Sequence, residues 1–124
     1  MSTLLQSQAI EFTVYGTPRP QGSKRHVGHG VMIEMSKHLK PWRQEIASTA
    51  LALNAIPFGP HFPLELTLNF YFSKPNSSKR RSMTTRPDSS KLLRAVEDAL
   101  PGILFHDDAQ IIETHIRKHY GGPE

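Results

Sequence analysis

Residues 64–72, LELTLNFYF, limit the possible folds more than any other segment, because apolar and polar side chains alternate through all nine positions. Side chains on a strand point alternately to the two faces of a sheet, whereas a helix would distribute these residues around its axis. The alternation therefore excludes a helix and predicts a strand with one buried face. The side chains expected on that face are Leu64, Leu66, Leu68, Phe70 and Phe72.

Two other segments carry apolar residues at spacings of three or four, which is the pattern of one helix face. The first covers about 41–54, where Pro41 suits the first turn because its missing N–H costs nothing there. The second covers about 88–100 and stops at Pro101 and Gly102. We expect a helix over each range.

Shorter alternations predict a first strand over about 10–15 and a last strand over about 110–119. In the last strand, Ile112, Thr114 and Ile116 are expected to share one face. The resulting order is β–α–β–α–β. It predicts a small α/β (or α+β) fold with one mixed sheet and two helices.

Composition is consistent with one domain over residues 1–124, with 1–8 and 121–124 expected to fray. The chain contains no cysteine, which excludes disulfides, thiol nucleophiles and thiolate metal sites. No apolar run approaches the roughly 18 residues that a membrane helix needs. The first residues lack the pattern of a secretory signal. We therefore expect a cytoplasmic protein with no membrane partner.

Positive charge is concentrated in two segments, although the net charge is only +4. Residues 16–43 contain six Lys and Arg against one acid, and residues 74–94 contain seven against one acid, leaving two of the fifteen elsewhere. Such basic segments suggest a polyanionic partner, most often nucleic acid. Two ordinary solvated loops remain the alternative. The polar stretch 73–87 predicts a long loop, and long loops in compact domains are often functional.

Acidic residues gather near the second predicted helix and the last predicted strand. Asp88 opens that helix, and Asp107 and Asp108 precede the strand. If the strand begins beside the helix N-terminus, Asp88 and Asp108 come together, and their oxygens suit Mg²⁺ or Mn²⁺. Alternatively, Asp88 is only an N-cap and the Asp107–Asp108 pair only forms a turn.

Lys91 and Arg94 are three residues apart and therefore neighbours on the same helix surface. Cations beside a metal site stabilise the extra negative charge that develops when a phosphodiester is cleaved. The alternative is ordinary solvation, or pairing with Glu97 or Asp98. The seven histidines are scattered without a zinc motif, so we do not expect zinc; His106, beside Asp107, is a candidate assistant in catalysis.

The stretch RPDSSKLLRAVEDALPGILFHDDAQI (86–111) resembles the RusA-type Holliday-junction resolvases. The family pattern is K-P-D-x-D-N-L-x-K-A-x-x-D-A-L, followed about ten residues later by D-D-x-Q-V. The segment YGTPRPQGSKRH (15–26) also resembles the basic, proline-rich loop after the first strand of many members. The matching residues of the main motif are Pro87, Asp88, Leu92, Ala95, Asp98, Ala99, Leu100, Asp107, Asp108 and Gln110.

The resemblance implies a homodimeric endonuclease that uses Mg²⁺, with Mn²⁺ as a possible substitute and no small-molecule cofactor. It implies binding to four-way DNA junctions and paired nicks in opposing strands, in recombination, repair or phage DNA processing. The catalytic residues it suggests are Asp88, Asp108, Lys91 and Arg94. The metal ligands would be Asp88 and Asp108, with Asp107 and Glu97 as possible further ligands. The expected phosphate contacts are Arg19, Lys24, Arg25, Lys79, Arg80, Arg81 and Arg86.

The chain departs from the family pattern at three positions. Ser90 replaces the second motif aspartate, Lys91 replaces an asparagine, and Arg94 replaces the catalytic lysine. Glu97, seven residues after Ser90, lies on nearly the same helix face and is a candidate substitute ligand. A non-cleaving junction-binding protein on the same fold is therefore a second hypothesis, and a basic structural or RNA-binding protein is a third. The apolar face of the second helix and Trp42 are candidate dimer contacts.

Overall fold

The structure is a computed structural model that describes residues 9–22, 24–26, 32–34 and 37–122, without the side chains of 23–36. The expectation of frayed ends falls mostly on residues outside this set. The helices and strands of the structure, in chain order, are β1 (Lys24–His26), β2 (Met32–Glu34), α1 (Leu39–Ala52), β3 (Leu64–Phe72), α2 (Ser89–Ala99), the short 3₁₀ helix η2 (Asp108–Gln110) and β4 (Ile111–Tyr120). Both predicted helices and the strand over 64–72 are confirmed, with helix bounds within two residues of those expected.

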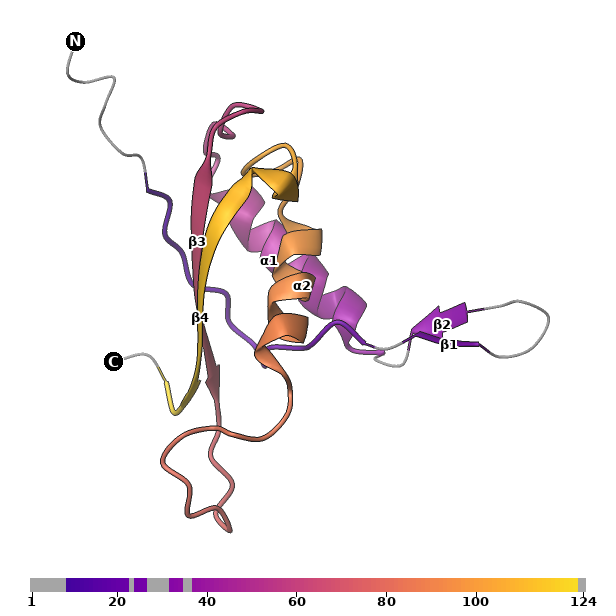
Figure 1. Ribbon diagram of the computed structural model, residues 1–124, viewed down its shortest axis with the longest axis vertical. Helices are drawn as coiled ribbons and strands as arrows, with labels where there is room; N and C mark the ends of the chain where they lie inside the picture. The colour runs from indigo at the N-terminus through magenta and orange to yellow at the C-terminus, as the bar shows by residue number, and fades with distance from the viewer. Residues whose placement is uncertain (1–8, 23, 27–31, 35–36, 123–124) are drawn as a thin grey trace.

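The main sheet consists of β3 and β4, which pair in parallel along their whole length. The prediction of a mixed sheet is therefore wrong. Parallel neighbours need a crossover connection, and α2 provides it. A separate antiparallel hairpin, β1–β2, stands out from the body of the molecule (Figure 1). The sequence pattern did not predict this hairpin.

The first predicted strand, over 10–15, forms no strand in the structure. Its alternation is nevertheless real, because Ile10, Phe12 and Val14 are half-buried against the core while the residues between them are exposed. Alternating burial reflects which side chains face the core. It does not show whether the backbone has a hydrogen-bonded partner, and for that reason the prediction failed here.

A register shift in the sheet changes the expected face of β4. Ile111 pairs with Leu64 and Glu113 pairs with Glu65, so Ile112 is displaced from the ladder. Ile112 is 74% exposed, and Ile111 packs against the core in its place. The prediction for Ile112 is wrong because a bulge inserts one residue and reverses the alternation beyond it.

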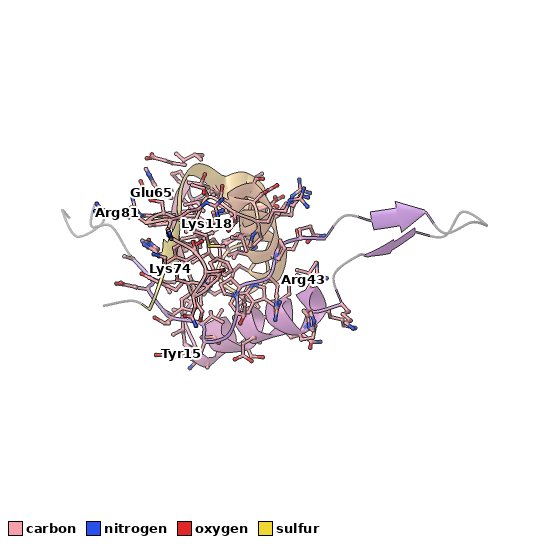
Figure 2. The ribbon with its side chains drawn as sticks, turned by 90° about the horizontal axis from the view of Figure 1, so that it is seen from below. Tyr15, Arg43, Glu65, Lys74, Arg81 and Lys118 are labelled. Carbon is pink, nitrogen blue, oxygen red and sulfur yellow. The ribbon has the colours of Figure 1, made fainter. Side chains whose placement is uncertain are left out.

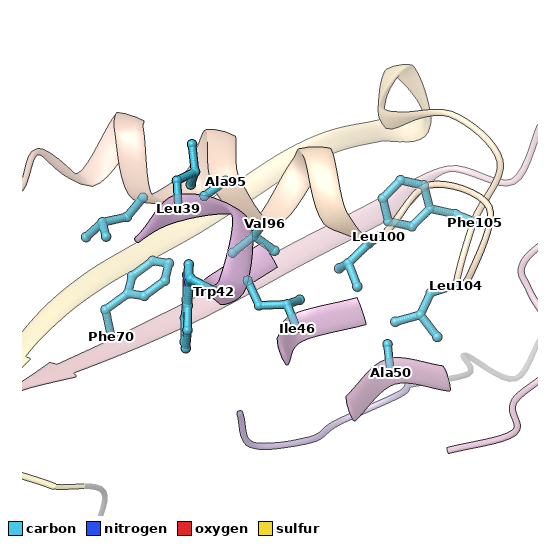
Figure 3. Close-up of a cluster of buried hydrophobic side chains, with 11 residues drawn as sticks. Leu39, Trp42, Ile46, Ala50, Phe70, Ala95, Val96, Leu100, Leu104 and Phe105 are labelled. Atoms are coloured by element: carbon cyan, nitrogen blue, oxygen red, sulfur yellow. The ribbon is translucent and has the colours of Figure 1, made fainter. Parts of the chain in front are cut away.

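The core lies between the sheet and the two helices (Figure 3). At its centre, Leu39 and Leu92 are fully buried. The remaining buried members of the cluster are Trp42, Ile46, Ala50, Phe70, Ala95, Val96, Leu100, Leu104 and Phe105. An ion pair of 3.6 Å between Arg43 Nη1 and Asp98 Oδ2 joins α1 to α2 at the surface.

Burial in this core corrects the predicted dimer contacts. The apolar face of α2 and the Trp42 ring both pack inside the protomer. They are therefore not available to a second copy of the chain. Separately, none of the helices in the described part of the chain is long and apolar enough to cross a membrane.

We predict that Leu92→Ala lowers the free energy of unfolding by about 2–5 kcal/mol, because it removes a fully buried side chain and leaves a cavity. Ile112→Ala is the matched control, since that side chain is exposed, and its effect should stay within about 0.5 kcal/mol. Urea unfolding followed by circular dichroism measures both. Equal effects of the two substitutions would contradict this packing.

Candidate functional site

The direction of α2 determines where the two ends of the motif segment, residues 86–111, lie in the fold. Because β3 and β4 are parallel, the connecting helix runs back in the opposite direction. Asp88 precedes its first turn, in the wall of a cavity that Phe72 and Tyr120, the last residues of β3 and β4, also line. Asp108 lies in η2, directly before β4 begins, at the other end of α2 (Figure 1).

The eleven residues of α2 span about 16 Å at the usual helical rise. Within one chain, Asp88 and Asp108 are therefore held apart by the length of this helix. The expectation that the last strand would begin beside the N-terminus of α2 is wrong, because β4 begins beside its C-terminal end. The parallel direction of the strands is the physical reason.

The carboxylate of Asp88 does not cap α2, although Asp88 occupies the N-cap position. The backbone carbonyl of Asp88 accepts bonds from the amides of Lys91 and Leu92, both at 3.1 Å, but its exposed side chain makes no capping bond. The alternative role of Asp88 as an ordinary cap is thus not supported by the structure. Its carboxylate is therefore available to bind a cation.

Lys118 positions the backbone that leads into Asp88. Its Nζ donates hydrogen bonds to the carbonyls of Thr85 at 2.8 Å and Pro87 at 2.9 Å. Lys118 belongs to β4, so this contact ties the end of the long loop to the sheet. Bonds from a charged donor are about twice as strong as neutral ones. Sequence reasoning did not identify Lys118, and its partners are backbone atoms that no motif reveals.

Asp107 stabilises a turn at the opposite end of α2. Its Oδ1 accepts a hydrogen bond of 2.8 Å from the Ala109 amide and forms a capping box with Gln110. This supports the alternative reading of Asp107 as a turn residue. Its second carboxylate oxygen remains a candidate metal ligand.

Gln110 holds this turn in place. Among the described residues, it is the polar residue that is buried. Its Oε1 accepts bonds from the amides of His106 at 2.9 Å and Asp107 at 3.0 Å. Its Nε2 donates to the carbonyls of Gly59 at 2.6 Å and Phe62 at 3.0 Å. One side chain therefore connects the turn before β4 to the loop before β3. Gln110 matches the family motif, but the motif alone did not assign it this role.

Glu97 shares its end of α2 with Asp108. Burial raises the pKa of the Glu97 carboxyl, the charge of Asp108 raises it further, and Arg94 opposes the shift. Lys91, in contrast, lines the same cavity as Asp88. The predicted catalytic residues Asp88 and Lys91 thus lie at one end of α2, whereas the predicted catalytic residue Asp108 and the predicted metal ligand Glu97 lie at the other. Arg94 is the middle residue of α2 and lies three residues from both Lys91 and Glu97.

The outer face of the sheet carries a cluster that sequence reasoning missed. His115 Nε2 lies 2.7 Å from Glu113 Oε2 and 3.9 Å from Glu65 Oε1. Among the described residues, these three form the one set of three or more acidic or histidine side chains whose ligand atoms all lie within 4.8 Å of one another. Their chemistry suits a divalent cation, although all three are exposed. Glu65 is labelled in Figure 2. The alternation of each strand predicts that polar side chains face away from the core. Only the register between β3 and β4 brings these three side chains together.

The predicted phosphate contacts lie mainly on the loop between β3 and α2. Lys79, Arg80, Arg81 and Arg86 are exposed there, and Met83 anchors the loop by its buried side chain. Arg81 and the neighbouring Lys74 are visible at the end of the molecule in Figure 2. Arg19 is half-buried in the wall of the cavity beside Asp88. The backbone of Lys24 and Arg25 forms part of β1, but their side chains are outside the described part of the chain.

Comparison with known proteins supports the motif assignment. Residues 11–124 match the protein family described as endodeoxyribonuclease RusA. The chain is also similar to the uncharacterized protein YqaN of Bacillus subtilis (strain 168). The two are 28% identical over 128 residues, which cover 90% of this chain and 87% of that protein.

We predict that Gln110→Met lowers the free energy of unfolding by about 2–3 kcal/mol. The substitution keeps the volume but leaves the amides of His106 and Asp107 without their acceptor. Urea unfolding measures the loss, and hydrogen exchange of the His106 and Asp107 amides should accelerate. Gln44→Met, on the exposed surface of α1, is the control and should change neither quantity. The same result for both variants would refute this role for Gln110.

Proposed function

This chain belongs to the RusA family of endodeoxyribonucleases, and from this membership we propose that it resolves four-way (Holliday) DNA junctions by paired nicks in opposing strands. The match over residues 11–124 confirms the resemblance of the motif segment and carries the proposal. The proposed cation is Mg²⁺, with Mn²⁺ as a substitute.

The carboxylates proposed as metal ligands do not converge within one chain, so a single protomer does not fit the cation. A dimer resolves this difficulty. A two-fold axis that passes beside the middle of α2, perpendicular to the helix, would place the α2 helices of two protomers antiparallel to each other. Asp88 of one protomer would then approach the partner's Asp108 and the partner's Glu97. We therefore propose that the functional unit is a homodimer with two composite sites.

The outer edge of β4 is a suitable surface for this dimer. Among the described residues, β4 pairs with β3 alone, which leaves a row of backbone donors and acceptors on its other edge. Antiparallel pairing of two β4 edges would extend the sheet across the molecular two-fold. It would also place the start of one β4 beside the end of the other, as the composite site requires.

The residues have distinct proposed roles. Asp88 and the partner's Asp108 hold the cation, with Glu97 and the second oxygen of Asp107 as further ligands. When bound, such a cation lowers the pKa of a water molecule and neutralises charge on the phosphate. Lys91, beside Asp88, stabilises the negative charge that develops on the scissile phosphate, and Arg94, about one turn further along α2, is the second cation proposed for this role.

The basic residues Arg19, Lys24, Arg25, Lys79, Arg80, Arg81 and Arg86 are proposed to contact DNA phosphates. Contacts of this kind release counterions, so binding should weaken steeply with salt. A four-way junction has two-fold symmetry, which matches a dimer with two sites.

A non-cleaving junction-binding protein is the second candidate, and Ser90 favours it. Ser90 is exposed in the first turn of α2, where family members carry a second aspartate. One carboxylate fewer weakens the attraction for a divalent cation. In this case the fold would bind junctions without cutting them.

A cleavage assay distinguishes the two candidates. A labelled four-way junction and a matching linear duplex are incubated with the protein in Mg²⁺, Mn²⁺ or EDTA. We expect metal-dependent paired nicks in the junction alone. Selective binding without nicks in either metal would favour the second candidate and make Ser90→Asp the next variant. Equal binding to both substrates would contradict junction recognition.

The composite site predicts complementation between two inactive variants. Asp88→Asn and Asp108→Asn should each bind junctions but reduce nicking at least 100-fold, as expected when about 3 kcal/mol of transition-state stabilisation is lost. A mixed dimer, however, contains one site with both aspartates intact. After the two variants are mixed and allowed to exchange subunits, roughly a quarter of the sites should be intact, and nicks should occur singly.

A site contained within one protomer gives the opposite result, since every site in the mixed dimer would then lack one carboxylate. No recovery after verified subunit exchange would therefore exclude the composite site. A mixture of wild type with Asp88→Asn serves as the control for exchange, because it should give half-active mixed dimers under either arrangement.

A further inference from the structure

The cavity at the N-terminal end of α2 is large enough for one nucleotide. Its volume is about 550 Å³, within the range of roughly 300–1,000 Å³ that is usual for small-molecule sites. Its walls come from the proline-rich segment 17–22, the ends of β3 and β4, the end of the long loop and the first turn of α2. A backbone bond of 2.9 Å from the Gln21 amide to the Lys91 carbonyl joins the first of these walls to the last.

The lining combines the two kinds of chemistry that a nucleotide presents. Phe72, Tyr120 and the buried Met83 supply aromatic and apolar surface. Arg19 and Lys91 supply positive charge in the same cavity. Aromatic surface binds the face of a base, and stacking of this kind is worth about 1–3 kcal/mol per base. The cations suit the phosphate attached to it.

The Tyr120 ring is already oriented by a cation. Lys74 Nζ lies 5.8 Å from the ring centroid, in the arrangement of a cation–π contact. Tyr120 is also held by its pairing with Phe72 across the sheet. A ring positioned in this way loses little conformational freedom when a base stacks on it.

A base that is stacked within a duplex cannot place its face against the wall of this cavity. A nucleotide can enter only after it leaves its stack, and this step costs least where the stacking of the duplex is already interrupted. The strand-exchange point of a four-way junction is such a place. We propose that this cavity receives one unstacked nucleotide from that point; the identity of the DNA substrate rests on the proposed function.

Capture of a nucleotide there would set the position of the neighbouring phosphate. Asp88 and Lys91 line the same cavity, so the phosphate next to the captured base would lie beside the proposed metal-binding carboxylate. The cavity thereby links recognition of an unstacked nucleotide to the choice of the phosphodiester that is cut. Stacking is tolerant of base identity, so the cavity selects unstacked nucleotides rather than a sequence.

Photocrosslinking tests this inference without depending on cleavage. The probe is a short single-stranded oligonucleotide with one 5-iodouracil, which crosslinks to aromatic side chains that it contacts, in a buffer with EDTA. We expect mass spectrometry to locate the crosslink on Tyr120 or Phe72. Ser73→Leu places a branched aliphatic side chain in the cavity wall, which fills space without adding a ring for stacking. It should reduce that crosslink and the affinity for the strand about ten-fold or more.

Ser77→Leu is the matched control, because Ser77 is an exposed residue of the same loop that does not line the cavity. It should crosslink like the wild type, and thermal unfolding should show that both variants are folded. Crosslinks only outside the cavity, or equal crosslinking of the two variants, would overturn the inference.

Junction nicking by the wild-type protein in Mg²⁺, measured in parallel, separates this inference from the proposed function. Nicking without a crosslink at Tyr120 or Phe72 would reject the nucleotide site and leave the resolvase proposal standing. A crosslink there without nicking would support the nucleotide site and reject the proposed cleavage.

Discussion

The parallel pairing of β3 with β4 is the constraint on which the rest of the molecule depends. Two parallel strands joined by one helix require the helix to run in the opposite direction. This direction buries one face of α2 against the sheet and α1. It also separates Asp88 from Asp108 by the length of α2, although both belong to one short motif. The division of the proposed site between two protomers follows from this single topological fact.

Each end of α2 is held by a polar side chain that reaches a segment distant in the sequence. At the Asp88 end, Lys118 on β4 binds the carbonyls of Thr85 and Pro87. At the Asp108 end, Gln110 binds the preceding turn and the loop before β3. Both side chains bind backbone carbonyls of irregular segments and hold those segments in place. They leave the carboxylates of Asp88 and Asp108 outside these structural networks.

Tertiary neighbours decide between the roles that the sequence allows for individual acidic residues. Asp88 was expected either to bind a metal or to cap a helix, and the absence of a capping bond removes the second role. For Asp107 the structure supports the role in a turn, because its Oδ1 accepts a hydrogen bond from a turn amide. The sequence makes Glu97 a candidate further ligand of a metal held by Asp88 and Asp108, and in the structure the charge of Asp108 acts on its carboxyl. Sequence spacing could not distinguish these cases, because it reports position along α2 but not what lies beside each end.

Local pattern was sufficient for the two helices, for β3 and for the motif that identifies the family, because periodic burial and a contiguous motif are properties of neighbouring residues. The tertiary structure alone decided the parallel sheet, the bulge that exposes Ile112, and the pairing of Glu65 with Glu113. It also decided that Asp88 and Asp108 lie at opposite ends of α2. These features depend on which segments meet in space, and strand direction and register leave no periodic signal in either strand.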